Sequence, residues 1–174
     1  AFLGYRGFPA VLCASINDEV VHGIPKRGRI LREGDIIGLD FGAEVDGYFG
    51  DAALTVPVGR VSDEALRLIE TTQEALGKGI EAARNGSRVG DVASAVQRHA
   101  EAAGFSVVRE FIGHGIGRSL HEDPPVPNYG KPGTGTRLRP GMTLAIEPMI
   151  NAGGTAVRVL EDRWTAVTAD RSLS

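Results

Sequence analysis

The dipeptide Asp46-Gly47, which lies between two runs of apolar and aromatic residues, constrains the fold of this chain more than any other feature. Asp-Gly favours a two-residue hairpin turn, because both turn positions need a positive φ and these residue types tolerate it. The flanking runs, 35–45 and 48–56, are rich in Ile, Val, Leu, Phe and Tyr. They therefore predict the two strands of a β-hairpin.

The register of this hairpin brings two acidic residues together. With the turn so placed, Gly42 faces Asp51, and Asp40 lies two residues away on the same face. Two carboxylates at such a diagonal are costly unless a proton or a cation lies between them. Solvation of both on an exposed face is the alternative. A buried acidic site is favoured because the neighbours are apolar: Leu39, Phe41, Phe49 and Ala52.

Two segments have the apolar spacing of amphipathic helices. The first covers 65–83 with Ser62 as its N-cap and Ile80 in its apolar stripe, and the second covers 89–103 with Ser87 as its N-cap. Further strands are predicted over 107–112, 143–150 and 156–160, and a long ordered loop over 123–141. Hairpins on either side of a helical pair predict an α+β fold with a largely antiparallel sheet.

Composition excludes several classes of protein. The net charge of −3 gives no electrostatic case for binding nucleic acid. The longest stretch without Asp, Glu, Lys or Arg is eleven residues, short of the ~20 that span a bilayer, so no membrane segment is expected. The only cysteine, Cys13, fits a reducing compartment, and we expect a cytoplasmic protein.

Histidines and a second acid occupy glycine-rich or apolar surroundings. His114 lies among three glycines in 113–117, His121 follows seven residues later, and His22 precedes a Gly/Pro turn. Glu147 lies within an apolar run, where an unpaired carboxylate is costly. For each histidine taken alone, a hydrogen-bonded loop residue is the favoured interpretation.

Two aspartates, one histidine and one glutamate in such surroundings form an oxygen-rich ligand set with one nitrogen. This set suits Mn, Fe, Co or Zn in a carboxylate-bridged pair. Two metals sharing a water would polarise a carbonyl and hydrolyse an amide. Nucleophilic catalysis is less favoured, because Cys13 has no evident base and Ser119 lacks a Gly-x-Ser-x-Gly elbow.

The motifs together resemble the type I methionine aminopeptidase family, in the order and spacing of that family. They are the segment 17–25, Leu39-Asp40 with Gly50-Asp51, the segment 113–117, His121-Glu122 and Glu147-Pro148. The resemblance implies the pita-bread α+β fold, with a curved antiparallel sheet covered by helices. It also implies removal of the N-terminal methionine from nascent proteins.

Carried over residue by residue, the resemblance implies two divalent ions (Co, Mn, Fe or Zn). Their ligands would be Asp40, Asp51, His114 and Glu147, with Asp51 bridging. Glu147 would also accept the proton of a metal-bridging water that attacks the first peptide bond. His22 and His121 would contact the scissile amide and stabilise the tetrahedral intermediate.

The resemblance also implies an apolar methionine pocket, which suits a thioether side chain. Its residues would be Tyr5, Phe8, Cys13, Leu120 and Trp164. Ordinary core packing is the competing interpretation for each of them, and for Phe8 and Leu120 the two interpretations weigh equally.

We expect residues 1–174 to form a single metallopeptidase catalytic domain that lacks an N-terminal segment and the last C-terminal strands of the family. The family's fifth ligand, a second bridging glutamate, would fall past Ser174. The implied partner is the N-terminal methionine of a nascent polypeptide, with the ribosome as a candidate partner. A monomer is expected.

Two other functions compete. A prolidase or Xaa-Pro aminopeptidase shares the fold and the ligand set, but the segment 17–25 and the pocket residues match the methionine-specific branch better. A non-catalytic pita-bread domain that binds peptides is the alternative from a different class. It would be favoured by substituted ligands, yet four of the five family ligands are present.

Overall fold

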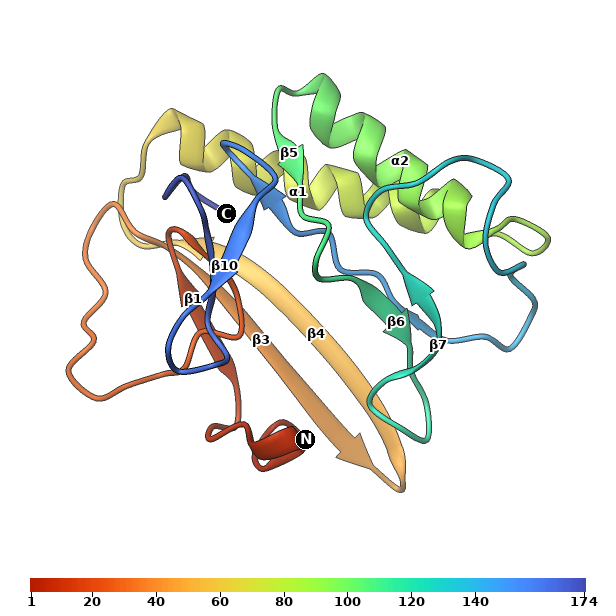
Figure 1. The fold of residues 1–174 in the computed structure, drawn as a ribbon, viewed down its shortest axis with the longest axis horizontal. Helices are drawn as coiled ribbons and strands as arrows, with labels where there is room; N and C mark the ends of the chain where they lie inside the picture. Colours follow the sequence, from red (N-terminus) through yellow and green to blue (C-terminus); the bar gives the residue numbers. More distant parts are fainter.

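The computed structural model describes residues 1–174, and a long β-hairpin forms its base (Figure 1). Strand β3 (Ile36–Val45) pairs antiparallel with β4 (Tyr48–Pro57), and Gly42 lies opposite Asp51 as predicted. The turn residues Asp46 and Gly47 have φ values of 52° and 76°. Positive φ at both positions is the geometry that an Asp-Gly turn favours, so the predicted hairpin and its register are confirmed.

Short strands extend this base into four small antiparallel sheets. β1 (Cys13–Ile16) pairs with the free edge of β3, so the first sheet has the order β1-β3-β4. The second has the order β10-β11-β2 and the third β7-β6-β8, while β5 pairs with β9. Their bounds are β2 Glu19–Val21, β5 Ser106–Val107, β6 Gly113–Gly115, β7 Glu122–Val126, β8 Leu144–Ala145, β9 Ile150–Asn151, β10 Val157–Val159 and β11 Ala166–Thr168.

Two helices run side by side along one side of the sheets (Figure 1). α1 (Asp63–Ala82) begins as predicted, because the Ser62 hydroxyl accepts a hydrogen bond from the Ala65 amide at 3.2 Å. α2 (Val89–Ala102) lies within the predicted range, but its N-cap is one residue later than predicted. Its N-cap is Arg88 rather than Ser87, since the Arg88 amide donates to the Asp91 carboxylate at 2.7 Å and fixes the first turn.

The main core lies between these helices and the strands β3, β5 and β9. Its nine buried residues are Ile36, Ala65, Leu68, Ala75, Val96, Ala100, Phe105, Val107 and Ile150. The predicted apolar stripe of α1 was partly wrong, because Ile80 is 57% exposed. Glycine at position 79 of α1 lets α2 approach closely. A Cβ built on Gly79 would lie only 3.0 Å from the Val96 side chain.

Two other predictions are corrected by proline chemistry. The predicted loop 123–141 begins inside β7, which tolerates Pro125 because it is an edge strand and its outer side needs no N–H donor. The predicted strand 143–150 is divided into β8 and β9. Pro148, which lies between them, has no N–H to continue a ladder.

Of the predicted strand 107–112, only residue 107 belongs to a strand, β5. None of the helices is long and apolar enough to cross a membrane.

We predict that Gly47→Ala destabilises the hairpin. An L-residue at a φ of 76° costs about 1–2 kcal/mol of unfolding free energy. Gly50→Ala is the matched control, because a Cβ at Gly50 meets nothing within 4 Å. We expect it to change the free energy by less than about 0.5 kcal/mol. Urea unfolding of both variants measures the difference, and equal losses would contradict the role of the turn.

Candidate metal centre

His114 lies in the middle of β6, between two strands that approach it very closely. A Cβ on Gly113 would run into the Ala145 carbonyl of β8, and one on Gly115 into the Asp123 carbonyl of β7. Only glycine therefore permits this packing on both sides. The glycine-rich motif is a means of burying one imidazole between two neighbouring backbones.

One hydrogen bond determines the tautomer of the neutral His114 ring. Nδ1 of His114 lies 2.8 Å from the Gly115 carbonyl oxygen, which can only accept, so Nδ1 carries the proton. In the neutral ring Nε2 then presents its lone pair. This arrangement, with one ring nitrogen anchored on a backbone carbonyl, is the one that metal-binding histidines use.

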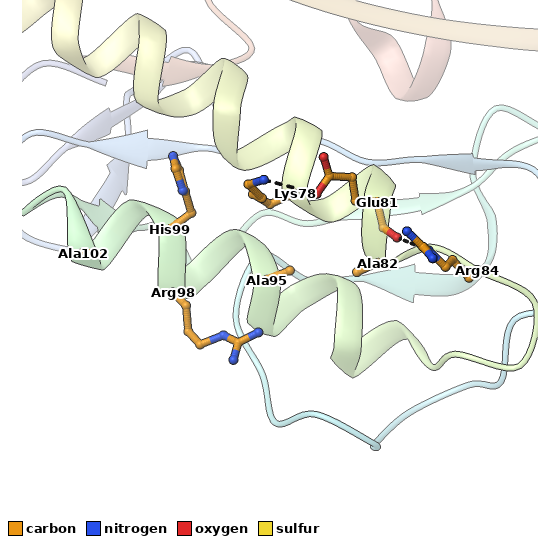
Figure 2. Close-up of a pocket in the computed structure, with 8 residues that line it drawn as sticks. All are labelled: Lys78, Glu81, Ala82, Arg84, Ala95, Arg98, His99 and Ala102. Carbon is orange, nitrogen blue, oxygen red and sulfur yellow. Dashed lines mark hydrogen bonds and ion pairs between the residues drawn. The ribbon is translucent and has the colours of Figure 1, made fainter.

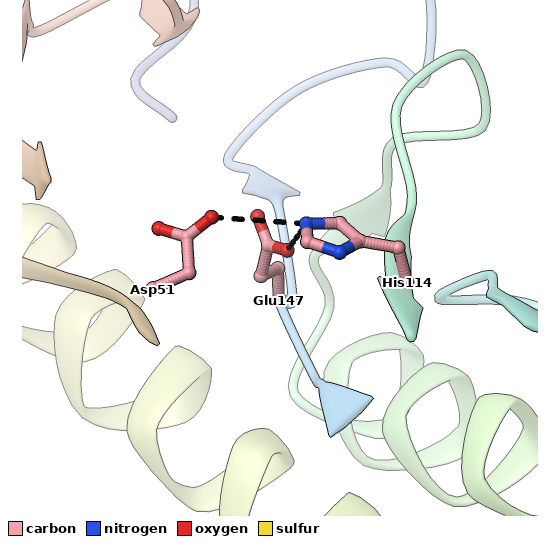
Figure 3. Close-up of side chains that lie close together, drawn as sticks. All are labelled: Asp51, His114 and Glu147. Carbon is pink, nitrogen blue, oxygen red and sulfur yellow. Dashed lines mark ion pairs between the residues drawn. The ribbon is translucent and has the colours of Figure 1, made fainter. Parts of the chain in front are cut away.

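Two carboxylates converge on Nε2 of His114 (Figure 3). The Asp51 Oδ2 atom lies 3.7 Å away and the Glu147 Oε1 atom 3.2 Å away. One ligand atom from each of the three residues lies within 4.8 Å of the others. They come from β4, from β6 and from the segment that follows β8, so the fold alone brings them together.

Without a cation, the buried carboxylates of this cluster repel one another. Burial, and then the charge of Glu147, raises the pKa of Asp51. Burial, Asp51 and Glu147 together raise the pKa of the adjacent Asp40 to about 8. Burial lowers the pKa of His114, but Glu147, the Gly115 carbonyl and Asp51 outweigh it, so that pKa is raised. The site therefore retains protons that a cation would displace.

A divalent cation fits these residues. The buried Glu147 Oε1 atom has no hydrogen-bond donor, although an unsatisfied carboxylate oxygen is costly. A cation would satisfy this oxygen and offset the repulsion among the carboxylates. Oxygen ligands with one imidazole are chosen by Mn, Fe, Co and Zn rather than by soft metals. Asp40 is outside the group of three, and its predicted role as a ligand stays a prediction.

The structure places the other two predicted histidines around this cluster. The His121 ring lies 4.0 Å from the His114 ring between centroids. His22 follows β2 with a φ of 59°, and its ring meets Phe111 and Trp164 edge to face at 5.4 and 6.1 Å. Burial lowers the pKa of both histidines, and for His121 the neighbouring His114 lowers it further.

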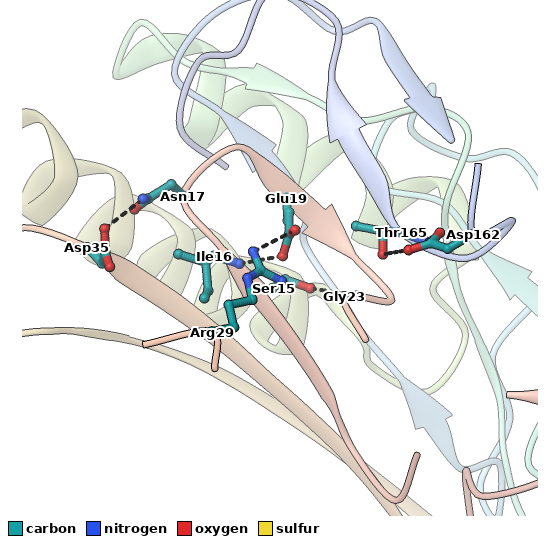
Figure 4. Close-up of polar contacts among 9 residues, drawn as sticks. All are labelled: Ser15, Ile16, Asn17, Glu19, Gly23, Arg29, Asp35, Asp162 and Thr165. Atoms are coloured by element: carbon teal, nitrogen blue, oxygen red, sulfur yellow. Dashed lines mark hydrogen bonds and ion pairs between the residues drawn. The ribbon is translucent and has the colours of Figure 1, made fainter. Parts of the chain in front are cut away.

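A polar network fixes the backbone that leads to His22 (Figure 4). The Glu19 carboxylate accepts from the Ile16 amide at 2.9 Å and pairs with Arg29 at 2.7 Å. The Asn17 side chain accepts from the Ile36 amide at 3.0 Å and donates to Asp35 at 2.8 Å. These contacts tie the β1–β2 turn to β3, so the unusual φ of His22 is held by its surroundings.

The backbone at Trp164 is also fixed by a carboxylate that accepts several hydrogen bonds. The Asp162 carboxylate accepts from the amides of Trp164 and Thr165 at 3.0 and 2.9 Å, and from the Thr165 hydroxyl at 2.7 Å. Sequence reasoning missed this turn and the role of Phe111 against His22. The Asp-x-x-Thr spacing of 162–165 was the available signal for the turn.

The five residues of the predicted methionine pocket do gather in one apolar cluster. Phe8, Cys13 and Leu120 are buried in it, and Tyr5 and Trp164 pack against it. The cluster also contains Phe2 and Ile116, which sequence reasoning missed. Because Cys13 lies opposite Asp40 in the β1–β3 ladder, the apolar cluster adjoins the carboxylates. Burial, and then the charge of Asp40, raises the pKa of the Cys13 thiol to about 12, so it stays uncharged.

A cavity of about 700 Å³ reaches the carboxylates from the other side. It is lined by Asp40, Asp51, Glu147 and His22, and by the α1 residues Ile69, Thr72, Leu76 and Ile80. A second hollow of about 500 Å³ lies on the outer side of α1 and α2 (Figure 2). There Lys78 pairs with Glu81 at 3.2 Å, and His99 pairs with Glu74 at 2.8 Å. It lacks converging carboxylates, so the metal centre belongs to the first cavity.

Comparison with known proteins agrees with this site. Residues 3–166 match metallopeptidase family M24. The methionine aminopeptidase 1 of Bacillus subtilis is 52% identical over 98% of this chain and 68% of that protein. The crystal structure of a methionine aminopeptidase from Thermotoga maritima superposes with a TM-score of 0.98 at 50% identity, over 99% of this chain and 70% of that one. A prolidase from Pyrococcus horikoshii superposes with a TM-score of 0.69 at 25% identity, over 91% and 43%.

The fold and the cluster of carboxylates and imidazole define a metallopeptidase, and the chain belongs to family M24. The superposition confirms the pita-bread α+β fold that the sequence predicted. Within the family the chain groups with the methionine aminopeptidases.

We predict that Gly115→Ala displaces His114. Its new Cβ meets the Asp123 backbone, and such overpacking costs about 1–3 kcal/mol of unfolding free energy. In Gly117→Ala the Cβ meets only the exposed Glu122 side chain at 3.2 Å, which can move. Metal titration and urea unfolding of both variants test this. Normal metal affinity in Gly115→Ala would contradict the packing argument.

We predict that the metal-free protein loses stability as the pH rises. The Asp40 pKa is about 8 in the folded chain and about 4 in the unfolded chain, so between these values only the folded state holds the proton. Unfolding free energy therefore falls through this window. Urea midpoints at about pH 5.5 and about pH 8.5 measure the loss.

Asp40→Asn should reduce this dependence, because the amide resembles the protonated acid and cannot ionise. Asp46→Asn, in the exposed hairpin turn, is the matched control and should retain the full dependence. An equal decline in Asp40→Asn and the unaltered chain would show that another group is responsible.

Proposed function

We propose that this chain is a metal-dependent aminopeptidase that removes the N-terminal methionine of nascent proteins. The observation that carries the proposal is the convergence of Asp51, His114 and Glu147 beside an apolar cluster. The methionine aminopeptidases of Bacillus subtilis and Thermotoga maritima, at about 50% identity over nearly the whole chain, support the same activity.

In this proposal the residues of the site have distinct chemical roles. A divalent cation, when bound, supplies a Lewis acid and lowers the pKa of water. The Glu147 carboxylate accepts a proton, and its Oε1 atom has no competing donor. His22 and His121, neutral because burial lowers their pKa, each donate one N–H to the carbonyl oxygen of the first peptide bond.

In this proposal the apolar cluster binds the methionine side chain of the substrate. Cys13 and Leu120 are only 4% and 2% exposed, and Phe8 meets Trp164 edge to face at 5.1 Å. Aromatic rings and an uncharged thiol suit a long, flexible thioether and exclude charged side chains. Tyr5 lies at the edge of the same cluster.

The competing functions have weaker support. The prolidase of Pyrococcus horikoshii is only 25% identical, and this chain covers 43% of its length. A non-catalytic peptide-binding domain would not need three ligand groups within 4.8 Å of one another.

The finer expectations form part of the same proposal. We propose two divalent ions, Co, Mn, Fe or Zn, with Asp40 as the fourth ligand and Asp51 as the bridge. We propose a monomer that acts in the cytoplasm, where the free thiol of Cys13 stays reduced. The ribosome remains a candidate partner.

The test uses the full-length protein, stripped of metal and reloaded with Mn or Co. We expect release of methionine from a Met-Ala-Ser peptide, no cleavage of Ala-Pro-Ser, and loss of the activity with a chelator. Cleavage of the proline-linked peptide would assign a prolidase. Silence on both peptides, with metal bound, would leave the non-catalytic alternative.

His114→Ala should lower methionine release more than about a hundredfold, because even the outer-shell partners of a metal cost 10–100-fold. His99→Ala is the matched control. It also removes an imidazole, but on the outer side of α2, and should leave release unchanged. Normal turnover in His114→Ala would refute the assignment of the metal centre.

A further inference from the structure

Tyr5 makes a contact with His121 that lining an apolar pocket does not require. Its hydroxyl oxygen lies 2.9 Å from Nδ1 of His121. The two rings are also stacked, with centroids 5.3 Å apart and planes within 16°. The residues are 116 positions apart in sequence, so this pairing is a product of the fold.

We propose that Tyr5 is a positioning residue that fixes which ring nitrogen of His121 carries the proton. The Tyr5 hydroxyl donates to Nδ1, so the single proton of the neutral ring stays on Nε2. His121 then presents Nε2–H to the reacting carbonyl. The catalytic use of this N–H rests on the proposed function, whereas the tautomer itself does not.

One neighbour favours this direction of the hydrogen bond. The Arg6 guanidinium lies 5.4 Å above the centre of the Tyr5 ring. A positive charge there stabilises electron density on the phenol oxygen, which makes the hydroxyl a better donor and a poorer acceptor.

The reverse direction would leave the Tyr5 O–H without a partner inside the protein. If Nδ1–H donated to the phenol oxygen, the O–H would have to donate to water, because His121 is its only hydrogen-bond partner in the chain. Nε2 of His121 would then present a lone pair beside the His114 ring, whose centroid lies 4.0 Å from that of His121. A lone pair cannot stabilise a developing oxyanion.

Nitrogen-15 NMR of the full-length, metal-free protein with labelled histidine tests the tautomer directly. The signals of His121 are identified by their loss in His121→Asn. We expect the proton on Nε2 in the unaltered protein, a mixture of tautomers in Tyr5→Phe, and no change in Tyr129→Phe. Tyr129 is the matched control, because its ring packs against the main core under Arg109. A proton on Nδ1, or an unchanged tautomer in Tyr5→Phe, would overturn the proposal.

Kinetics of the reloaded enzyme separate positioning from simple pocket lining. Tyr5→Phe keeps the stacked ring, so we expect kcat to fall about tenfold while KM stays within about twofold. A raised KM with unchanged kcat would overturn the positioning role. If the unaltered enzyme releases no methionine, the proposed function fails, but the NMR result still decides the tautomer.

Discussion

The pairing of β3 with β4 is the interaction on which the rest of the molecule depends. Its ladder places Asp51 opposite Gly42 and next to the position of Asp40, and it offers an edge to β1, which contains Cys13. A slip of one residue in this pairing would leave the two aspartates on opposite faces of the hairpin. The metal centre, the apolar cluster and the cavity between the hairpin and α1 therefore all depend on one Asp-Gly turn.

The carboxylates of the site are arranged against their own electrostatic preference. Burial and mutual repulsion raise the pKa of Asp40 and Asp51, and the Glu147 Oε1 atom lacks a donor. The fold tolerates this because glycines on either side of His114 let β7 and β8 hold the imidazole in place. Such a strained, oxygen-rich centre is expected where a cation is part of the working protein.

The histidines show how neutral groups complement these charges. His114 has Nδ1 anchored on a backbone carbonyl, whereas His121 has Nδ1 facing a phenol. The first arrangement leaves a lone pair for a metal, and the second, in our proposal, leaves an N–H for substrate. Two imidazoles 4.0 Å apart can thus perform opposite tasks, because their second nitrogens have different partners.

The sequence by itself determined the hairpin, its register and both helices, and it singled out Asp51, His114 and Glu147, which the structure brings together. These are signals of local chemistry, since turn residues, N-caps and apolar spacing act within a few positions. Only the tertiary structure decided which strands flank β6, that Glu122–Val126 is an edge strand, and that Ile80 stays exposed. It also decided the contact between Tyr5 and His121. Pairings across more than a hundred residues leave no local pattern, because packing and backbone approach select them only once the whole chain has folded.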